Sequence, residues 1–191
     1  MGIESPVIFI WHVVPGHNIK SNTESSDGFL LPYPAPPGVG KMINLYGEEI
    51  YWLVTNDKEP AARALADRHY SRKTPGSPKG FMGPGGHLIL ISPDSKALFG
   101  WLRARPDMRK DHIDGIYCAI FRNESNILSS RLILEAEKFA QMKWPGLMMF
   151  TYVDQAKVKS KRPGWSFLKA GWVEAGLSKK GLILLQKEVE K

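Results

Sequence analysis

Short runs of apolar, β-branched and aromatic residues alternate along the chain with loops rich in glycine, proline and charged residues. Runs of this kind are typical of β-strands. They predict strands over residues 6–14, 49–55, 87–92, 97–104, 116–122, 147–153, 172–175 and 181–187. The run LMMFTYV at 147–153 is almost wholly apolar, so we expect that strand to lie at the centre of a sheet.

Three other segments have the apolar spacing, capping residues or stop signals of helices. These segments are 59–70, 131–144 and 163–172. For the first helix, Asn56 or Asp57 is the expected N-cap, and a proline lies near the first turn. For the second, Ser129 or Ser130 is the expected N-cap. Gly171 is expected to end the third.

The order of these elements predicts how the strands pair. Three consecutive strands without a helix between them form an antiparallel meander, and the helix at 131–144 carries the chain to a strand that can pair in parallel. We therefore predict an α/β fold with a mixed sheet, in which crossover helices accompany an antiparallel meander and a central parallel strand. Residues 1–48 form an N-terminal strand and Pro/Gly/Ser-rich extension, and 49–191 form the main domain of a single compact unit.

The composition excludes several classes of protein. With 191 residues, 43% hydrophobic and 24% charged, the chain is an ordinary globular protein rather than a disordered one. No apolar run approaches the roughly 18 residues of a transmembrane helix, and no signal peptide is recognisable. We therefore expect no membrane partner and a cytoplasmic location. The single cysteine, Cys118, excludes an internal disulfide and a multi-cysteine zinc site.

The net charge of +7 is unevenly distributed. Residues 63–110 carry +7 and residues 155–191 carry +6, whereas 1–62 carry −4 and 111–154 carry −2. If the fold brings the two basic blocks together, they form a surface for nucleic acid or for a cofactor with a pyrophosphate. The alternative is a basic protein with dispersed lysines, and the sequence leaves both interpretations open.

Two basic loops and one strand end hold the candidates for contact with nucleic acid. The loops SRKTPGSPKG and KVKSKRPGW combine basic residues with small or aromatic ones, as expected of a surface that follows a phosphate backbone and stacks a base. The strand end offers two arginines on one face. The candidates are Arg72, Lys73, Arg103, Arg105, Lys159, Lys161, Arg162 and Trp165. The alternative for Arg103 and Arg105 is an exposed strand end without a ligand, and the alternative for Trp165 is simple packing in the core.

The segment CAIFRNESNILSSRLILEAEKFA, together with the element order, resembles the loop and central helix of GNAT-fold acyltransferases. In that family the backbone amides of this loop bind the pyrophosphate of coenzyme A, because a helix N-terminus attracts anions. The resemblance implies acetyl-CoA as cofactor. It assigns cofactor binding to Arg122, Asn126, Ser129 and Ser130. The chain departs from the family where Asn126 and Leu128 replace glycines and where Phe167 replaces the tyrosine acid.

Three shorter motifs are similar to the bacteriophage Mom family of GNAT-fold enzymes. They are HYS at 69–71, YVD at 152–154 and GWSFLKAGWVEAG at 164–176. Mom enzymes add an acetamido-type group to N6 of adenine in DNA and thereby block restriction enzymes. The resemblance implies a transferase for double-stranded DNA in a bacterial cytoplasm. An adenine that is modified on N6 must leave the base stack, and Tyr70, Trp165 and Trp172 are candidate walls of its pocket. Core packing is the alternative for the two tryptophans, and the sequence favours it for Trp172.

Asp154, Tyr70 and His69 are the candidate catalytic residues. Asp154 follows the predicted central strand, at the strand end where α/β sheets hold their active sites, and can act as a base. Tyr70 can donate a proton or stack on a base. The alternatives are a cap or ion pair for Asp154 with Lys157 or Lys159, and a packed core position for His69. No spacing supports a metal site, although these three side-chain types suit iron or another transition metal.

Three functions remain open from the sequence. The first is a Mom-type enzyme that modifies DNA. The second is a conventional GNAT N-acetyltransferase for a small molecule or a protein. The third is a nucleic-acid-binding protein of the same fold without catalytic activity.

Overall fold

The computed structural model of the chain describes residues 42–43, 47–105, 107, 109, 111–158 and 160–189. The strand expected at 6–14 and the loop expected at 15–40 lie outside these residues. They stay predictions, as does the division of the chain at residue 48.

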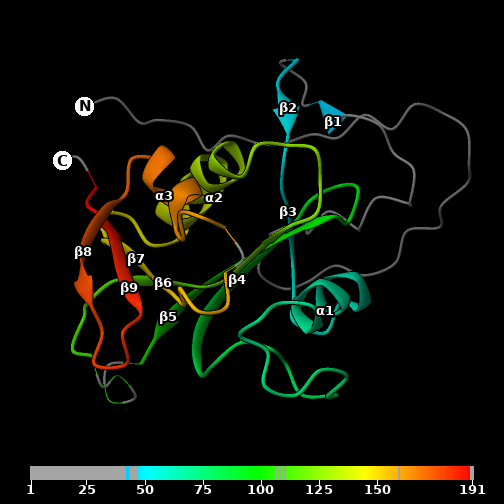
Figure 1. Cartoon of the computed structure of the whole chain (residues 1–191). Coiled ribbons are helices and arrows are strands. Elements are labelled where there is room, and N and C mark those ends of the chain that lie inside the picture. The colour runs from blue at the N-terminus through cyan, green and yellow to red at the C-terminus, as the bar shows by residue number, and fades with distance from the viewer. Residues whose placement is uncertain are drawn as a thin grey trace, which may run out of the picture.

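One mixed sheet forms the centre of the described part of the chain (Figure 1). Its strands are β3 (Leu53–Thr55), β4 (Gly85–Ile91), β5 (Ala97–Ala104), β6 (Ile116–Asn123), β7 (Met149–Val153), β8 (Val173–Leu177) and β9 (Ile183–Lys187). Their spatial order is β3-β4-β5-β6-β7-β9-β8, and every neighbouring pair is antiparallel except β6 and β7. This is the predicted GNAT-like mixed sheet. Two short strands, β1 (Met42–Ile43) and β2 (Glu49–Ile50), pair separately.

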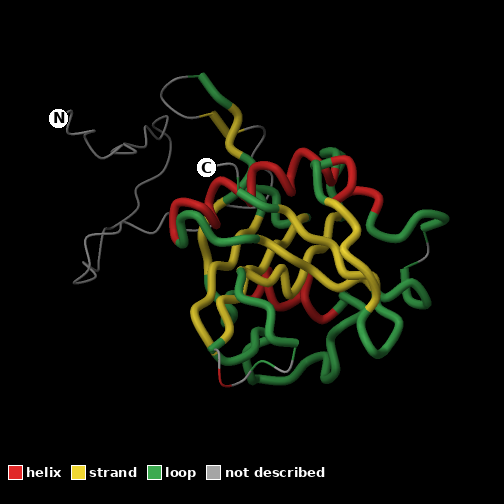
Figure 2. Tube along the Cα trace, turned by 90° about the vertical axis from the view of Figure 1, so that its left-hand side faces the viewer, coloured by secondary structure: helices red, strands yellow, loops and turns green. Residues whose placement is uncertain are grey.

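Helices cover both faces of the sheet (Figure 2). The helix α2 (Ser129–Lys143) makes the crossover between β6 and β7, and the short α3 (Trp165–Lys169) packs beside it. The helix α1 (Pro60–Asp67) covers the other face with its apolar side, where Leu65 packs against Ile89 and Leu98. Each face therefore has its own hydrophobic cluster, as a sheet covered by helices requires.

Buried tryptophans fix α2 to the sheet through hydrogen bonds as well as packing. The indole N–H of Trp52 donates to the carbonyl of Leu132 at 2.9 Å, and that of Trp101 donates to the carbonyl of Ala136 at 3.0 Å. On the same helix, the buried carboxylate of Glu137 accepts from the Trp172 indole at 2.6 Å. A buried indole needs such a partner, so Trp172 is a core residue rather than a wall of a ligand pocket.

Several boundaries differ from the prediction. The first helix ends at Asp67 rather than at Tyr70, so His69 and Tyr70 lie in the turn that follows it. The strand predicted at 49–55 is divided into β2 and β3. Neither helix has the expected cap: Glu59 precedes α1 and Leu128 precedes α2, and neither makes a side-chain capping bond. Gly171 follows α3 with φ 86°, the left-handed conformation expected of a terminating glycine.

Candidate functional site: a cleft between β6 and β7

The parallel strands β6 and β7 pair over only a short stretch and then separate. Their register contains Ile116 with Met149 and Tyr117 with Phe150, yet β6 continues to Asn123 and β7 to Val153. The Thr151 hydroxyl, which donates to the Cys118 carbonyl at 3.0 Å, is the last link that ties the strands before they part. A cleft of about 720 Å³ occupies the space beyond it. We call this space the β6/β7 cleft.

A β-bulge places an unpaired residue in the wall of this cleft. On β5, Gly100 pairs with Ile120 and Trp101 pairs with Cys118, so the register passes over Ala119. The ladder with β7 ends at Tyr117. Ala119 therefore has no partner in either ladder, and it lines the cleft. Bulges of this kind are frequent beside active sites because they release backbone polar groups from the sheet.

The bulge has a signal in the sequence at Gly100. A Cβ at this position would lie 2.6 Å from the Ile120 side chain and 3.0 Å from the Met82 sulfur. Only glycine therefore allows β5 to pass the irregular stretch of β6 at this point.

Tyr70 brings a phenol to the cleft from the turn after α1. Its side chain is 37% exposed, and it lines the cleft opposite α3. Burial of the hydroxyl raises the pKa of Tyr70, and a hydrogen bond with the backbone of Asp154 partly offsets that rise. The phenol is therefore protonated at neutral pH and lies next to Asp154, as expected of a proton donor.

His69 is a neutral, packed histidine. The backbone N–H of Ser71 donates to Nδ1 at 3.3 Å, and the Ser71 hydroxyl lies 2.8 Å from the same atom. Burial and the nearby Arg122 lower the pKa of His69 to about 4, against a hydrogen bond to the backbone of Phe121. Its ring stacks on Tyr70 with centroids 4.3 Å apart. Both residues follow the end of α1, where the two neighbouring rings contact each other.

Asp154 lies at the end of β7, where the sequence predicted it. Its Oδ1 accepts from the backbone N–H of Ala156 at 3.1 Å, and Oδ2 lies 3.7 Å from Nζ of Lys157. The carboxylate thus makes both the cap and the ion pair that the sequence offered as the alternative to a catalytic role. It also lines the cleft, as Tyr70 does.

The segment between β7 and α3 gives the cleft a basic and aromatic rim. Trp165 is 40% exposed, and its ring lies between two cations, Arg162 at 4.9 Å and Lys169 at 4.8 Å. The other basic residues that line the cleft are Lys73, Lys157 and Lys180. Of the described residues that line the cleft, Asp154 is the only carboxylate.

The apolar wall of the cleft includes Phe167, for which the resemblance to GNAT enzymes implied a tyrosine acid. Its ring is buried against Phe121 and Trp172, with centroids 5.9 Å and 4.9 Å away. This residue therefore packs the core and has no proton to donate.

The loop between β6 and α2 is held together by Asn123. The Asn123 side-chain amide donates to the Ile127 carbonyl at 2.8 Å and to the Ser129 hydroxyl at 3.0 Å. The α2 N-terminus has neither a side-chain cap nor an acidic residue in its first turn. Its first backbone N–H groups can therefore donate hydrogen bonds to a bound anion. Ser130 is half-buried in that turn, and Asn126 is exposed in the loop.

Arg122 is committed to a structural network instead. Its guanidinium bonds to Glu124 and to the carbonyl of Arg68, and Arg68 also pairs with Glu124. The Arg68 hydrogen bond, with Arg122 beside it, lowers the pKa of Glu124 to about 2.

The structure gathers only part of the predicted nucleic-acid surface at the cleft. Lys73, Arg162 and Trp165 line it, and Lys161 is exposed next to Arg162. Arg72 is instead held by Asp67 at 2.9 Å, with its side chain only 10% exposed. Lys159 lies outside the described residues.

Arg103 and Arg105 lie at the opposite end of the sheet. Because β5 runs antiparallel to β6, its last residues are next to the start of β6, just past the pair of Leu102 and Tyr117, and they do not line the cleft. There Arg103 pairs with Asp114 and Arg105 with Asp107. The end of the sheet at which these arginines lie is determined by how β5 pairs with β6, and the sequence does not show this pairing.

The described residues contain no group of three His, Cys, Asp or Glu side chains that could hold a metal ion. His69 is bonded to Ser71 and to the backbone of Phe121, and it forms no such group with Tyr70 and Asp154. In the same part of the chain, no helix is long and apolar enough to cross a membrane.

Comparisons with known proteins give a likeness in structure and none in sequence. No protein-family model and no curated protein sequence matches the chain. The chain is similar to the crystal structure of an acyl-CoA N-acyltransferase from Pseudomonas aeruginosa, at 15% sequence identity and a TM-score of 0.46. The similarity covers 71% of this chain and 97% of that one. At this level the assignment of a GNAT-like fold rests on the chain's own strand order, parallel pair and crossover helix.

Proposed function

We propose that the chain is a transferase that moves an acyl group from an acyl-CoA thioester to an exocyclic amine of a DNA base. The Mom resemblance makes N6 of adenine the proposed nitrogen. The observation that carries the proposal is Ala119, which has no partner in either ladder and lies in the wall of a cleft with an aromatic and basic rim.

The residues present suit a CoA thioester. The uncapped α2 N-terminus follows the end of β6 and presents amides to an anion, although it is not among the residues that line the cleft. Those of Ser129 and Ser130 would hold the pyrophosphate, with Asn126 beside them. The side chain of Arg122 would not take part, because Glu124 and the carbonyl of Arg68 bind it.

The chain's own groups are placed for acyl transfer. A bound thioester supplies an electrophilic carbonyl carbon, and transfer forms the new N–C bond, breaks the C–S bond, releases one proton from nitrogen and adds one to sulfur. The backbone N–H of Ala119 would bind the carbonyl oxygen as negative charge develops there. Tyr70 would donate the proton to sulfur, and Asp154 would accept the proton from nitrogen. Tyr70 thus replaces the acid that is lost at Phe167.

The rim of the cleft supports a nucleic-acid acceptor. Lys73, Lys157, Arg162 and Lys180 offer positive charge to phosphates, and the exposed ring of Trp165 offers a stacking surface. Both basic blocks of the sequence contribute to this rim, as the first interpretation of the charge pattern predicted.

Mass spectrometry of nucleosides from cells that express the protein tests the proposal. We expect a new deoxyadenosine-derived mass with the intact chain and its loss in Tyr70→Phe. The matched control is Tyr51→Phe, which removes a hydroxyl bonded to Glu49 at a buried site that does not line the cleft. Unaltered nucleosides in the presence of confirmed soluble protein would contradict the proposal.

A further inference from the structure

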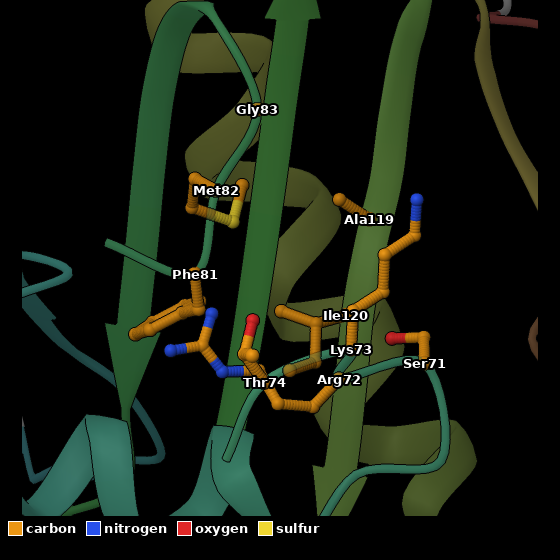
Figure 3. Close-up of a pocket in the computed structure, with 9 residues that line it drawn as sticks. All are labelled: Ser71, Arg72, Lys73, Thr74, Phe81, Met82, Gly83, Ala119 and Ile120. Carbon is orange, nitrogen blue, oxygen red and sulfur yellow. The ribbon is translucent and has the colours of Figure 1, made fainter. Parts of the chain in front are cut away.

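A second hollow lies on the α1 face of the sheet, beneath the loop that follows α1 (Figure 3). Its volume is about 360 Å³, near the lower limit of about 300 Å³ for small-molecule sites. Phe81, Met82 and Ile120 give it apolar walls, and Lys73 and Thr74 lie at its rim. We call this hollow the loop chamber.

The loop chamber adjoins the β6/β7 cleft at the bulge. Ser71, Lys73, Ala119 and Ile120 line both spaces. Figure 3 shows Lys73 extended along β6 toward Ala119, with Phe81 and Met82 on the far side of the chamber. A ligand in the chamber and a ligand in the cleft would therefore meet at Ala119, which is the requirement for an acceptor and a donor.

The charges of the loop chamber exclude a cationic acceptor. None of the described residues that line it is a carboxylate, whereas Lys73 and Arg72 are both cationic. Arg72 is already paired with Asp67, but Lys73 is exposed and makes no ion pair among the described residues. An aliphatic ammonium would be repelled here and would find no counter-charge. The chamber therefore suits a flat, uncharged group that carries its amine on an aromatic ring and an anion elsewhere.

We propose that the loop chamber binds the acceptor as a single nucleotide unit. The base lies against Met82, Phe81 and Ile120, its exocyclic amine faces Ala119, and the phosphate binds Lys73. This inference rests on the proposed function and names the acceptor site within it. It replaces Trp172, a core residue, as a candidate wall of the base pocket, and it leaves Trp165 to the nucleic acid outside. A thioether beside an aromatic ring is a favourable surface for a base.

Methyl NMR on the full chain tests the inference without catalysis. The methyl signals of Met82 and Ile120 are observed in three separate titrations, with deoxyadenosine monophosphate, spermidine and inorganic phosphate. The variants Met82→Leu and Ile120→Val identify which signal belongs to which residue. We expect both signals to shift with the nucleotide and with neither other ligand. Lys73→Ala should weaken the nucleotide affinity at least fivefold. Lys79→Ala is the matched control, because Lys79 is exposed in the same loop and does not line the chamber.

The other outcomes overturn the inference in distinguishable ways. Equal shifts with spermidine would show that the chamber takes cationic amines. Equal shifts with inorganic phosphate would show an anion site without base recognition. Unshifted methyl signals, in a protein that still modifies DNA, would place the acceptor elsewhere and leave the proposed function intact. Nucleotide-specific shifts in a protein that leaves DNA unmodified would support the chamber and contradict the function.

Discussion

The two sides of β6 differ in how completely they are paired. Toward β5 the ladder runs from Ala97 opposite Asn123 to Leu102 opposite Tyr117, with one bulge. Toward β7 it holds only Ile116 and Tyr117. On the β5 side, aromatic side chains fill the core, whereas the β7 side opens into a cleft with titratable groups.

This difference separates stability from chemistry along a single strand. A paired, packed edge contributes to the free energy of unfolding through buried apolar surface. An edge without a partner leaves backbone groups unsatisfied, and these can bind a ligand. Substitutions on the β5 side should therefore affect folding, and those on the β7 side should affect activity.

The largest expected effect is on folding, at Phe99. Its ring is fully buried on β5 and contacts the rings of Trp52, Trp101 and Phe121. Phe99→Ala should lower the free energy of unfolding by about 4 kcal/mol because it leaves a cavity. Urea denaturation measures this loss. Phe99→Leu keeps most of the volume and should cost less than half as much; equal costs would contradict the packing argument.

The next effect is on activity, at the bulge. Ala119→Pro removes the N–H that would bind the acyl oxygen, and an unpaired bulge position tolerates proline. We expect the rate of acyl transfer to fall about 100-fold with little change in the unfolding midpoint. Ala119→Gly keeps the N–H and is the control. A proline variant with full activity would remove Ala119 from the mechanism.

His69 closes part of the open side of β6 and should make folding sensitive to pH. Its pKa is about 4 in the folded chain, against 6.5 as the ordinary value. Protonation therefore favours the unfolded chain, and stability that is complete above pH 6.5 is lost as the pH falls toward 4. The loss should be on the order of 2 kcal/mol. His69→Gln does not titrate, so its urea midpoint should change less between pH 7 and pH 4; an unchanged difference would refute this role.

Alanine substitutions at Arg162 and Arg105 test whether DNA binds at the cleft or at the other end of the sheet. Arg162→Ala should weaken binding to a DNA duplex about tenfold and reduce the slope of log affinity against log salt by about 1. Arg105→Ala, at the far end and paired with Asp107, should leave both quantities unchanged. Fluorescence anisotropy at several salt concentrations measures them. Equal effects would mean that DNA binds over the whole surface rather than at the cleft.

The smallest effect is expected from Glu124. Its pKa of about 2 reflects the Arg68 and Arg122 partners, so its contribution is present above pH 4.5 and lost as the pH falls through 2. Because the pair is partly exposed, Glu124→Gln should cost less than about 1 kcal/mol at pH 7. The difference from the intact chain should disappear near pH 2 in urea denaturation.

The sequence predicts the elements of the fold better than it predicts the site. The strand at 97–104 and the mixed sheet are confirmed, because apolar periodicity and crossover rules determine them. Asp154 could be placed because the apolar run of β7 ends directly before it, whereas the sequence puts Tyr70 in a helix that in the structure ends at Asp67. Ala119 could not be identified: Gly100 is compatible with an irregular neighbouring strand, but only the register between the two strands shows which residue is left without a partner. The grouping of Arg103 and Arg105 with the other basic residues fails for the same reason.

The central claim is that acyl transfer takes place at Ala119, where β6 is paired with neither β5 nor β7. A crystal structure with a thioether analogue of acetyl-CoA, in which the sulfur is followed by a methylene group and a ketone, tests it most directly. We predict that the analogue lies between β6 and β7, with its ketone oxygen within hydrogen-bond distance of the Ala119 N–H and its sulfur near the Tyr70 hydroxyl. An analogue bound outside the cleft, or a ketone oxygen held by other groups, would contradict the account.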